Sequence, residues 1–97
     1  MTSHLNLVRE NSEAIKALVK EINASNIRIF GSVARGEENP KSDIDFIVDF
    51  DISNGFWDVI CLQGKIEDLL GVECDVLAVA ALKEEVRVNA LREAVAV

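Results

Sequence analysis

The 97-residue sequence has few of the residues that build the commoner catalytic and structural sites. It holds two cysteines, one histidine, one proline and no tyrosine. Cys61 and Cys74 lie inside apolar runs without metal-ligand spacing, so we expect reduced, buried thiols rather than a zinc site or a disulfide framework. No Ser, Cys or carboxylate motif accompanies His4, which argues against histidine-based catalysis.

Basic residues are also scarce, because ten Lys and Arg stand against seventeen Asp and Glu for a net charge of -7. Proteins that bind a phosphate backbone carry basic patches, so we expect no direct nucleic-acid binding. No stretch approaches the roughly 20 apolar residues of a membrane helix. The N-terminus lacks the basic-then-apolar order of a signal peptide. We therefore expect a cytoplasmic protein that does not contact membranes.

The residues that are present predict a folded protein, since 49% are hydrophobic and 28% are charged. The length fits a single domain over residues 1–97, without repeats or a linker. Periodicity predicts helices at 4–22, 56–70 and 82–95 and strands at 27–30, 43–50 and 72–79. This α-β-(turn)-β-α-β-α order predicts an α/β (α+β) fold, with flanking helices on a small mixed sheet of three strands.

The helices at 56–70 and 82–95 each have a predicted apolar side. Gly71 is the predicted stop of the first, and Gly64 weakens it. We favour a core position for Trp57, with a protein interface as the alternative. The positions expected on the apolar sides are Phe56, Val59, Ile60, Ile66, Leu69 and Leu70 in the first helix, and Leu82, Val86, Ala90 and Leu91 in the second.

Asp43 and Asp45 stand one residue apart at the start of the second strand. Strand side chains alternate between faces, so both carboxylates point one way and the apolar residues between and after them point the other. Two like charges at this spacing repel unless a cation screens them, and Mg²⁺ prefers oxygen ligands. The alternative is a solvated polar face on a half-exposed strand.

Gly31 and Ser32 end the first strand and open a tight turn. A glycine lets the backbone approach a phosphate, and the turn that follows offers N–H groups and a hydroxyl to anionic oxygens. Mg²⁺ commonly shares its coordination between carboxylates and phosphate oxygens. The two motifs therefore predict one site for a Mg-bound nucleoside triphosphate.

A third carboxylate would allow two metal ions to hold the attacking and leaving oxygens of a phosphoryl displacement. Asp75 in the third strand is our candidate. Glu73 shares its face by period two, but Asp75 lies nearer the apolar centre of the strand, where an unpaired carboxylate is harder to explain.

Gly31-Ser32, ten residues, then Asp43-Ile44-Asp45 resembles the G-S-x10-D-x-D pattern of the nucleotidyltransferase superfamily, which includes the DNA polymerase beta-like palm. The stretch from Phe30 to Phe50 is similar to the minimal nucleotidyltransferases, the antitoxin partners of HEPN toxins. The resemblance extends over almost the whole chain, including the C-terminal "ALKEEVRVNALREAVAV".

The resemblance implies a protein adenylyltransferase that transfers AMP from ATP to a tyrosine hydroxyl of a cognate HEPN ribonuclease toxin. It implies that Asp43 and Asp45 bind two Mg²⁺ ions and that Asp75 binds metal and helps to activate the hydroxyl. Gly31 and Ser32 would hold the phosphates that leave as pyrophosphate, with Arg35 as a further nucleotide contact.

The chain departs from the family after Gly36. Family members often continue with a second Ala-Arg pair, where this chain has Glu38-Asn39. Arg35 alone remains, as a phosphate or toxin contact or as the partner of Glu37 or Glu38. Lys41 is more simply a solvated charge, and Ser42 a turn residue.

Two other functions stay open on the sequence. One is a nucleotidyltransferase-like antitoxin that neutralises its toxin by binding alone, which the loss of the second arginine favours. The other is a transferase acting on a small molecule, whose relatives carry an additional substrate domain for which 97 residues leave no room.

Overall fold

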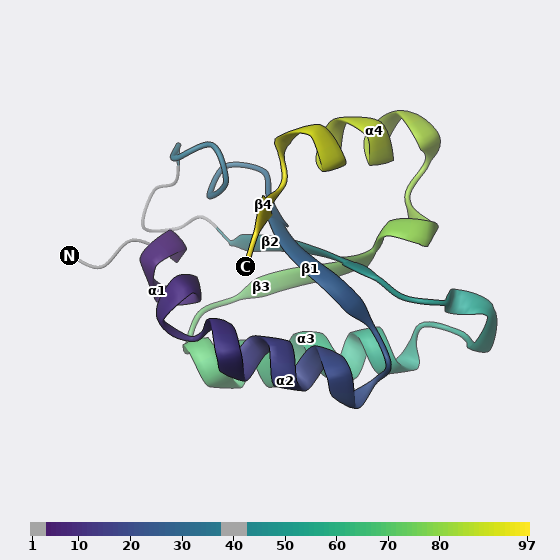
Figure 1. Ribbon diagram of the computed structural model, residues 1–97, viewed down its shortest axis with the longest axis horizontal. Coiled ribbons are helices and arrows are strands. Elements are labelled where there is room, and N and C mark those ends of the chain that lie inside the picture. Colours follow the sequence, from purple (N-terminus) through teal and green to yellow (C-terminus); the bar gives the residue numbers. More distant parts are fainter. Residues whose placement is uncertain (1–3, 38–42) are drawn as a thin grey trace.

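The computed structural model describes residues 4–37 and 43–97 as a mixed sheet with helices on both sides (Figure 1). The α/β class with a mixed sheet and flanking helices is confirmed. The sheet holds four strands in the order β3-β2-β1-β4, rather than the three expected. The elements in chain order are α1 (His4–Glu10), α2 (Ser12–Glu21), β1 (Ser25–Phe30), β2 (Ile44–Asp49), η1 (Ile52–Asn54), α3 (Trp57–Leu70), β3 (Cys74–Ala78), η2 (Val79–Ala81), α4 (Glu84–Glu93) and β4 (Val95–Ala96).

The predicted helix at 4–22 is wrong as one element, because it divides at Asn11. The Asn11 side chain donates to the carbonyl of Leu7 (2.8 Å), and its backbone N–H donates to Val8 (3.1 Å). An Asn side chain that bonds the neighbouring backbone competes with the helical pattern. Val8, Ile15 and Val19 are nevertheless buried, so α1 and α2 present one apolar face to the sheet.

β2 is the central strand, and its alternation positions the rest of the fold. Ile44, Phe46 and Val48 are fully buried in the core that α3 covers. β1 pairs with β2 in antiparallel orientation, as a connection of about a dozen residues allows, whereas β3 pairs with β2 in parallel. The parallel crossover from β2 to β3 runs through α3. α2 and α3 lie on one side of the sheet and α4 lies beyond the other (Figure 1).

α3 buries a different stripe from the one predicted. Its buried residues are Val59, Leu62, Ile66 and Leu70, spaced by three and four positions. Phe56, Trp57, Ile60 and Leu69 are exposed, which corrects the core position favoured for Trp57. Gly71 ends the helix with a left-handed backbone, as predicted.

The helix predicted at 82–95 stops at Glu93, and the residues after it form β4. Val95 and Ala96 pair with Ile29 and Arg28 of β1 in antiparallel orientation. Ala90 is the buried residue of α4, while Val86 and Leu91 are exposed and Leu82 is half-buried before the helix, so their predicted inward positions are wrong.

Both cysteines are free, as predicted, although Cys61 is only half-buried. Burial and the carboxylate of Glu67 raise the pKa of the Cys74 thiol to about 12, so this thiol stays protonated at neutral pH. No helix in the described part of the chain is long and apolar enough to cross a membrane.

Candidate active site

The parallel pairing of β2 and β3 places two of the predicted carboxylates side by side. Asp45 is in register with Asp75, and each is flanked by buried residues of its strand: Ile44 and Phe46 beside Asp45, Cys74 and Val76 beside Asp75. Both carboxylates therefore point away from the core, to the face opposite α3. Asp45 is half-buried and Asp75 is exposed.

Asp43 precedes β2 by one residue and is exposed. Burial raises the pKa of the Asp45 carboxyl above its ordinary value, and the charges of Asp75 and Asp43 raise it further. Three negative groups thus act on one another at this end of the sheet, at a free-energy cost that a bound cation would remove.

Gly31 brings the backbone against this carboxylate cluster. It follows Phe30, the residue that β1 places opposite Asp45, and it has a φ of 77°. A Cβ at this position would lie 2.7 Å from Asp45 Oδ2. Both the left-handed backbone and the contact require glycine here. The glycine of the Gly-Ser motif therefore packs directly against the carboxylate of Asp45.

The segment after Gly31 forms a single helical turn, as the sequence predicts. The Arg35 N–H donates to the Gly31 carbonyl (3.1 Å), and Glu37 N–H donates to the Ser32 carbonyl (2.9 Å). Gly36 closes the turn with a φ of 73°. Val33 is buried in the main core and anchors the turn to the sheet, and Ser32 before it is half-buried.

Arg35 leaves this turn and forms ion pairs with two acidic side chains. Its Nε donates to Glu37 Oε2 (2.9 Å), and a terminal nitrogen donates to Glu93 Oε2 (3.0 Å) at the end of α4. These bonds raise the pKa of Arg35, and its charge offsets only part of the rise in the pKa of Asp45. The arginine therefore lies between the carboxylate cluster and α4.

The chain matches a known protein family. A model described as a nucleotidyltransferase domain matches residues 8–97. The chain belongs to the nucleotidyltransferase family. Its sheet brings together the Gly-Ser turn, Asp45 and Asp75. The chain is a nucleotidyltransferase enzyme by this relationship.

Curated relatives of this nucleotidyltransferase come from archaea. It is 35% identical over 80 residues to the protein adenylyltransferase MntA of Thermococcus cleftensis. The aligned residues make up 82% of this chain and 81% of that protein. It is 39% identical over 67 residues to MJ0435 of Methanocaldococcus jannaschii, to which a protein adenylyltransferase activity is assigned, over 69% and 72% of the two chains.

Solved structures share the fold. One assigned as a minimal nucleotidyltransferase has a TM-score of 0.82 at 38% identity and covers 97% of this chain and 98% of that one. A crystal structure of a toxin-antitoxin with AMP-PNP has a TM-score of 0.69 at 21% identity, over 89% and 71% of the two chains. The second likeness shows the fold alone.

The donor set of the nucleotidyltransferase site fits a hard cation. Asp45 and Asp75 offer carboxylate oxygens from adjacent strands, and Asp43 acts on the same group electrostatically. Among residues 4–37 and 43–97, no three acidic, His or Cys side chains are close enough to form a metal cage. Mg²⁺ needs only one or two carboxylates, because waters and substrate phosphates complete its octahedral shell.

Sequence reasoning missed Glu93, and it could not separate Glu73 from Asp75 by period alone. An acidic residue in the last turn of a helix is unfavourable to the helix dipole, which is a signal that Glu93 has a partner elsewhere. Glu73 lies outside β3, and its carbonyl accepts from the Ile44 N–H (3.3 Å). Lys41, Ser42, Glu38 and Asn39 lie outside the described residues.

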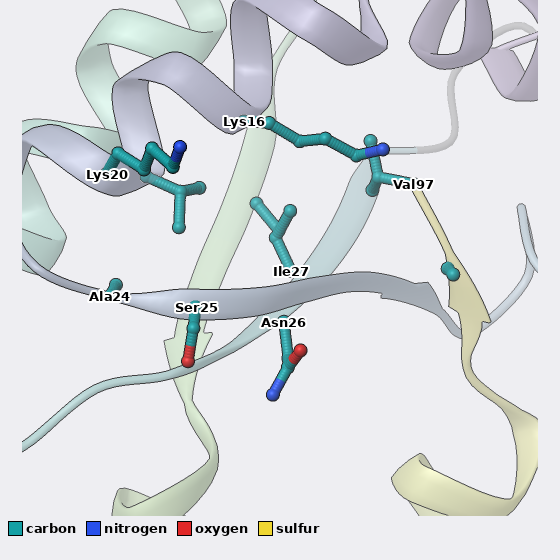
Figure 2. Close-up of a pocket in the computed structure, with 9 residues that line it drawn as sticks. Lys16, Lys20, Ala24, Ser25, Asn26, Ile27 and Val97 are labelled. Carbon is teal, nitrogen blue, oxygen red and sulfur yellow. The ribbon is translucent and has the colours of Figure 1, made fainter.

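A cavity of about 360 Å³ lies away from these carboxylates, at the opposite edge of the sheet (Figure 2). The side chains of Lys16 and Lys20 on α2 lie above Ile27 and Val97, which contribute to its apolar wall. None of the predicted site residues lines this cavity.

Proposed function

We propose that this nucleotidyltransferase is a Mg-dependent protein adenylyltransferase that transfers AMP from ATP to a tyrosine hydroxyl of a HEPN toxin, and thereby acts as its antitoxin. The observation that supports this chemistry most strongly is the pairing of Asp45 with Asp75 on adjacent strands. Gly31 lies against Asp45, at a position where any added Cβ would displace the Asp45 carboxylate. The protein acceptor follows from the adenylyltransferase names of the curated relatives.

The acidic residues supply the metal-binding and proton-accepting groups. Asp43, Asp45 and Asp75 would hold the two Mg²⁺ ions of a two-metal site, and bound Mg²⁺ would offset the charge that develops on the phosphate oxygens. Asp75 has the most open surroundings of the paired carboxylates, on edge strand β3. An acceptor hydroxyl arriving from solvent would reach it first and pass its proton to it.

The turn residues bind and orient the nucleotide. The left-handed backbone at Gly31 lets phosphate oxygens approach the main chain, and Ser32 offers a hydroxyl beside them. The guanidinium of Arg35 uses two of its five N–H donors on Glu37 and Glu93. We propose that another of its donors contacts a phosphate oxygen.

The proposed reaction transfers AMP to the acceptor and releases pyrophosphate. The deprotonated acceptor oxygen attacks the α-phosphorus of ATP, the bond from that phosphorus to the bridging oxygen of the β-phosphate breaks, and pyrophosphate leaves. The products are the O-adenylylated toxin, pyrophosphate and one proton on Asp75. Catalysis consists of positioning and electrostatic stabilisation, without a covalent enzyme intermediate.

The test is to incubate the protein with Mg²⁺, ATP labelled at its α-phosphate and the product of the adjacent gene. We expect label on that partner, with an R-x4-6-H motif in its sequence. We expect the label to be lost in the Asp43→Asn/Asp45→Asn double variant and retained in Glu73→Gln, an acidic residue next to the site.

The same assay separates the alternative antitoxin that acts by binding alone. Arg35 held by two carboxylates favours that alternative, since the cluster carries a net negative charge next to an anionic substrate. Neutralisation of the toxin that survives the double variant, with no label on the partner, would reject the transferase in its favour.

A further inference from the structure

Three large apolar side chains are exposed together where α3 begins. Exposure is 51% for Phe56, 72% for Trp57 and 59% for Ile60. Residues three and four positions apart on a helix are neighbours, so Ile60 lies beside both aromatics. We name these three residues the α3 patch. Exposed aromatic side chains that cluster in this way mark interaction sites, and Trp is the residue most enriched in binding hot spots.

Gly64 lies on the same outer face of α3, two turns after Trp57. It is exposed, and a Cβ built on it would have nothing within 4 Å. A glycine inside a helix weakens the helix, and neither the backbone nor the packing of this chain requires one here. A glycine at an exposed helix position does allow the backbone of another molecule to approach closely.

The charge around the α3 patch identifies what can cover it. From residue 50 to residue 64 the chain carries two aspartates and neither a lysine nor an arginine. Asp51 and Asp58 are both exposed next to the patch. A second copy of this face would bring like charges together, whereas a basic surface with an apolar pocket complements it.

The α3 patch is remote from the carboxylates. Asp45 lies near the start of β2, and α3 begins beyond the other end of that strand (Figure 1). The stretch from Asp45 to Asp49 alone spans about 13 Å. A molecule that covers both regions must therefore be a macromolecule, and binding at the patch need not change the binding of ATP.

We infer that the α3 patch, together with Gly64, is a docking surface for the protein acceptor, which meets it with an apolar pocket edged by Lys or Arg. This inference rests on the proposed function for the acceptor's role as substrate. The patch holds the acceptor at a distance from the carboxylates and so lowers the KM for the acceptor without contributing to the chemical step.

Affinity for the purified product of the adjacent gene, measured by calorimetry, tests this surface. We expect Trp57→Ala to weaken binding about tenfold or more. Gly64→Gln should weaken binding too, although it raises the melting temperature of the free protein by removing a helical glycine. Asp58→Lys should weaken it through charge, and Val88→Ala, an exposed apolar position on α4, should bind like the wild type.

The outcomes separate this inference from the proposed function. Trp57→Ala and Gly64→Gln that bind as tightly as Val88→Ala overturn the docking surface, even if AMP transfer occurs. Absence of binding by the wild type also overturns it, as does a wild-type dimer that Trp57→Ala dissociates. Binding that depends on Trp57 without any label transfer keeps the surface and rejects the transferase.

Discussion

Replacing Gly31 by alanine perturbs both the turn and Asp45, one of the carboxylates that we propose to be catalytic. The new residue must adopt a φ of 77°, and its Cβ would lie 2.7 Å from Asp45 Oδ2. Real Cβ atoms do not approach other atoms so closely, so the Asp45 side chain has to move. The variant therefore tests whether the Gly-Ser turn and the carboxylate form one site.

The expected loss of stability has two parts. A left-handed backbone costs an L-residue about 1–2 kcal/mol. Forcing Asp45 away from its rotamer costs about 0.5–1.5 kcal/mol more. The Gly31→Ala variant should therefore unfold with a free energy about 2–3 kcal/mol below the wild type. Activity should fall further, by about a hundredfold, because a catalytic group displaced by about 1 Å costs that much.

Two other glycines provide matched controls. Gly36 and Gly71 have φ values of 73° and 72°, and a Cβ on either would have nothing within 4 Å. Their alanine variants should lose only the 1–2 kcal/mol of the backbone. Urea denaturation measures the free energy of unfolding, and transfer of labelled AMP measures activity.

A double variant isolates the contact itself. In an Asp45→Ala background the carboxylate is absent, so Gly31→Ala should cost no more stability than Gly36→Ala. The reasoning is refuted if Gly31→Ala and Gly36→Ala lose equal stability and equal activity in the otherwise wild-type chain. It is also refuted if the extra cost of Gly31→Ala persists without the Asp45 side chain.

Three further predictions follow from charge and hydrogen bonding. The raised pKa of Asp45 means that the folded state holds this proton more tightly, so stability falls as pH rises through that pKa. In metal-free buffer Asp45→Asn should be more stable than wild type by up to about 1 kcal/mol at pH 7, and the gain should vanish below about pH 4 in urea titrations. Thiol reagents at pH 8 should label Cys61 and spare Cys74, by mass spectrometry, since the pKa of Cys74 is about 12. Gln63→Ala should cost about 1–2 kcal/mol in urea denaturation, because Gln63 Oε1 accepts from the Val76 N–H (3.1 Å) at the sheet edge.

The sequence predicts those parts of the fold that depend on local alternation. Ile44, Phe46 and Val48 recur at every second position of β2, and this spacing defines the face that α3 covers, although Ile47 on the other face is also buried. Gly71 marks the end of α3 by its backbone conformation alone. These features depend on neighbouring residues, so they can be read without knowledge of the rest of the molecule.

The misplaced elements depend on contacts between distant residues. Val95 and Ala96 continue the apolar pattern of α4, but pairing with Ile29 and Arg28 makes them a strand. The helical period is compatible with Trp57 either on the buried or on the exposed face of α3. Only the way in which α3 packs on the sheet leaves Trp57 exposed. Local periodicity does not encode which face finds a partner.

The residues of the candidate site likewise depend partly on local pattern and partly on contacts between distant segments. The spacing of Gly31, Asp43 and Asp45 is local and predicts the turn and the strand that carry them. The register of Asp75 with Asp45 requires the parallel pairing of β2 and β3, which the sequence suggests only through the resemblance. Glu93 and Arg35 are 58 positions apart in the sequence, and no local pattern predicts the ion pair between them.

A single-turnover assay with ATP labelled at its α-phosphate and the adjacent-gene product tests whether the carboxylates on β2 and β3 catalyse transfer of AMP to a protein hydroxyl. The assay compares Asp75→Asn with Glu73→Gln. We expect Glu73→Gln to label the partner at the wild-type rate. We expect Asp75→Asn to bind the partner normally but to label it at least about a hundredfold more slowly. Equal rates in the two variants, or a slow Glu73→Gln beside an active Asp75→Asn, would contradict this role of Asp75.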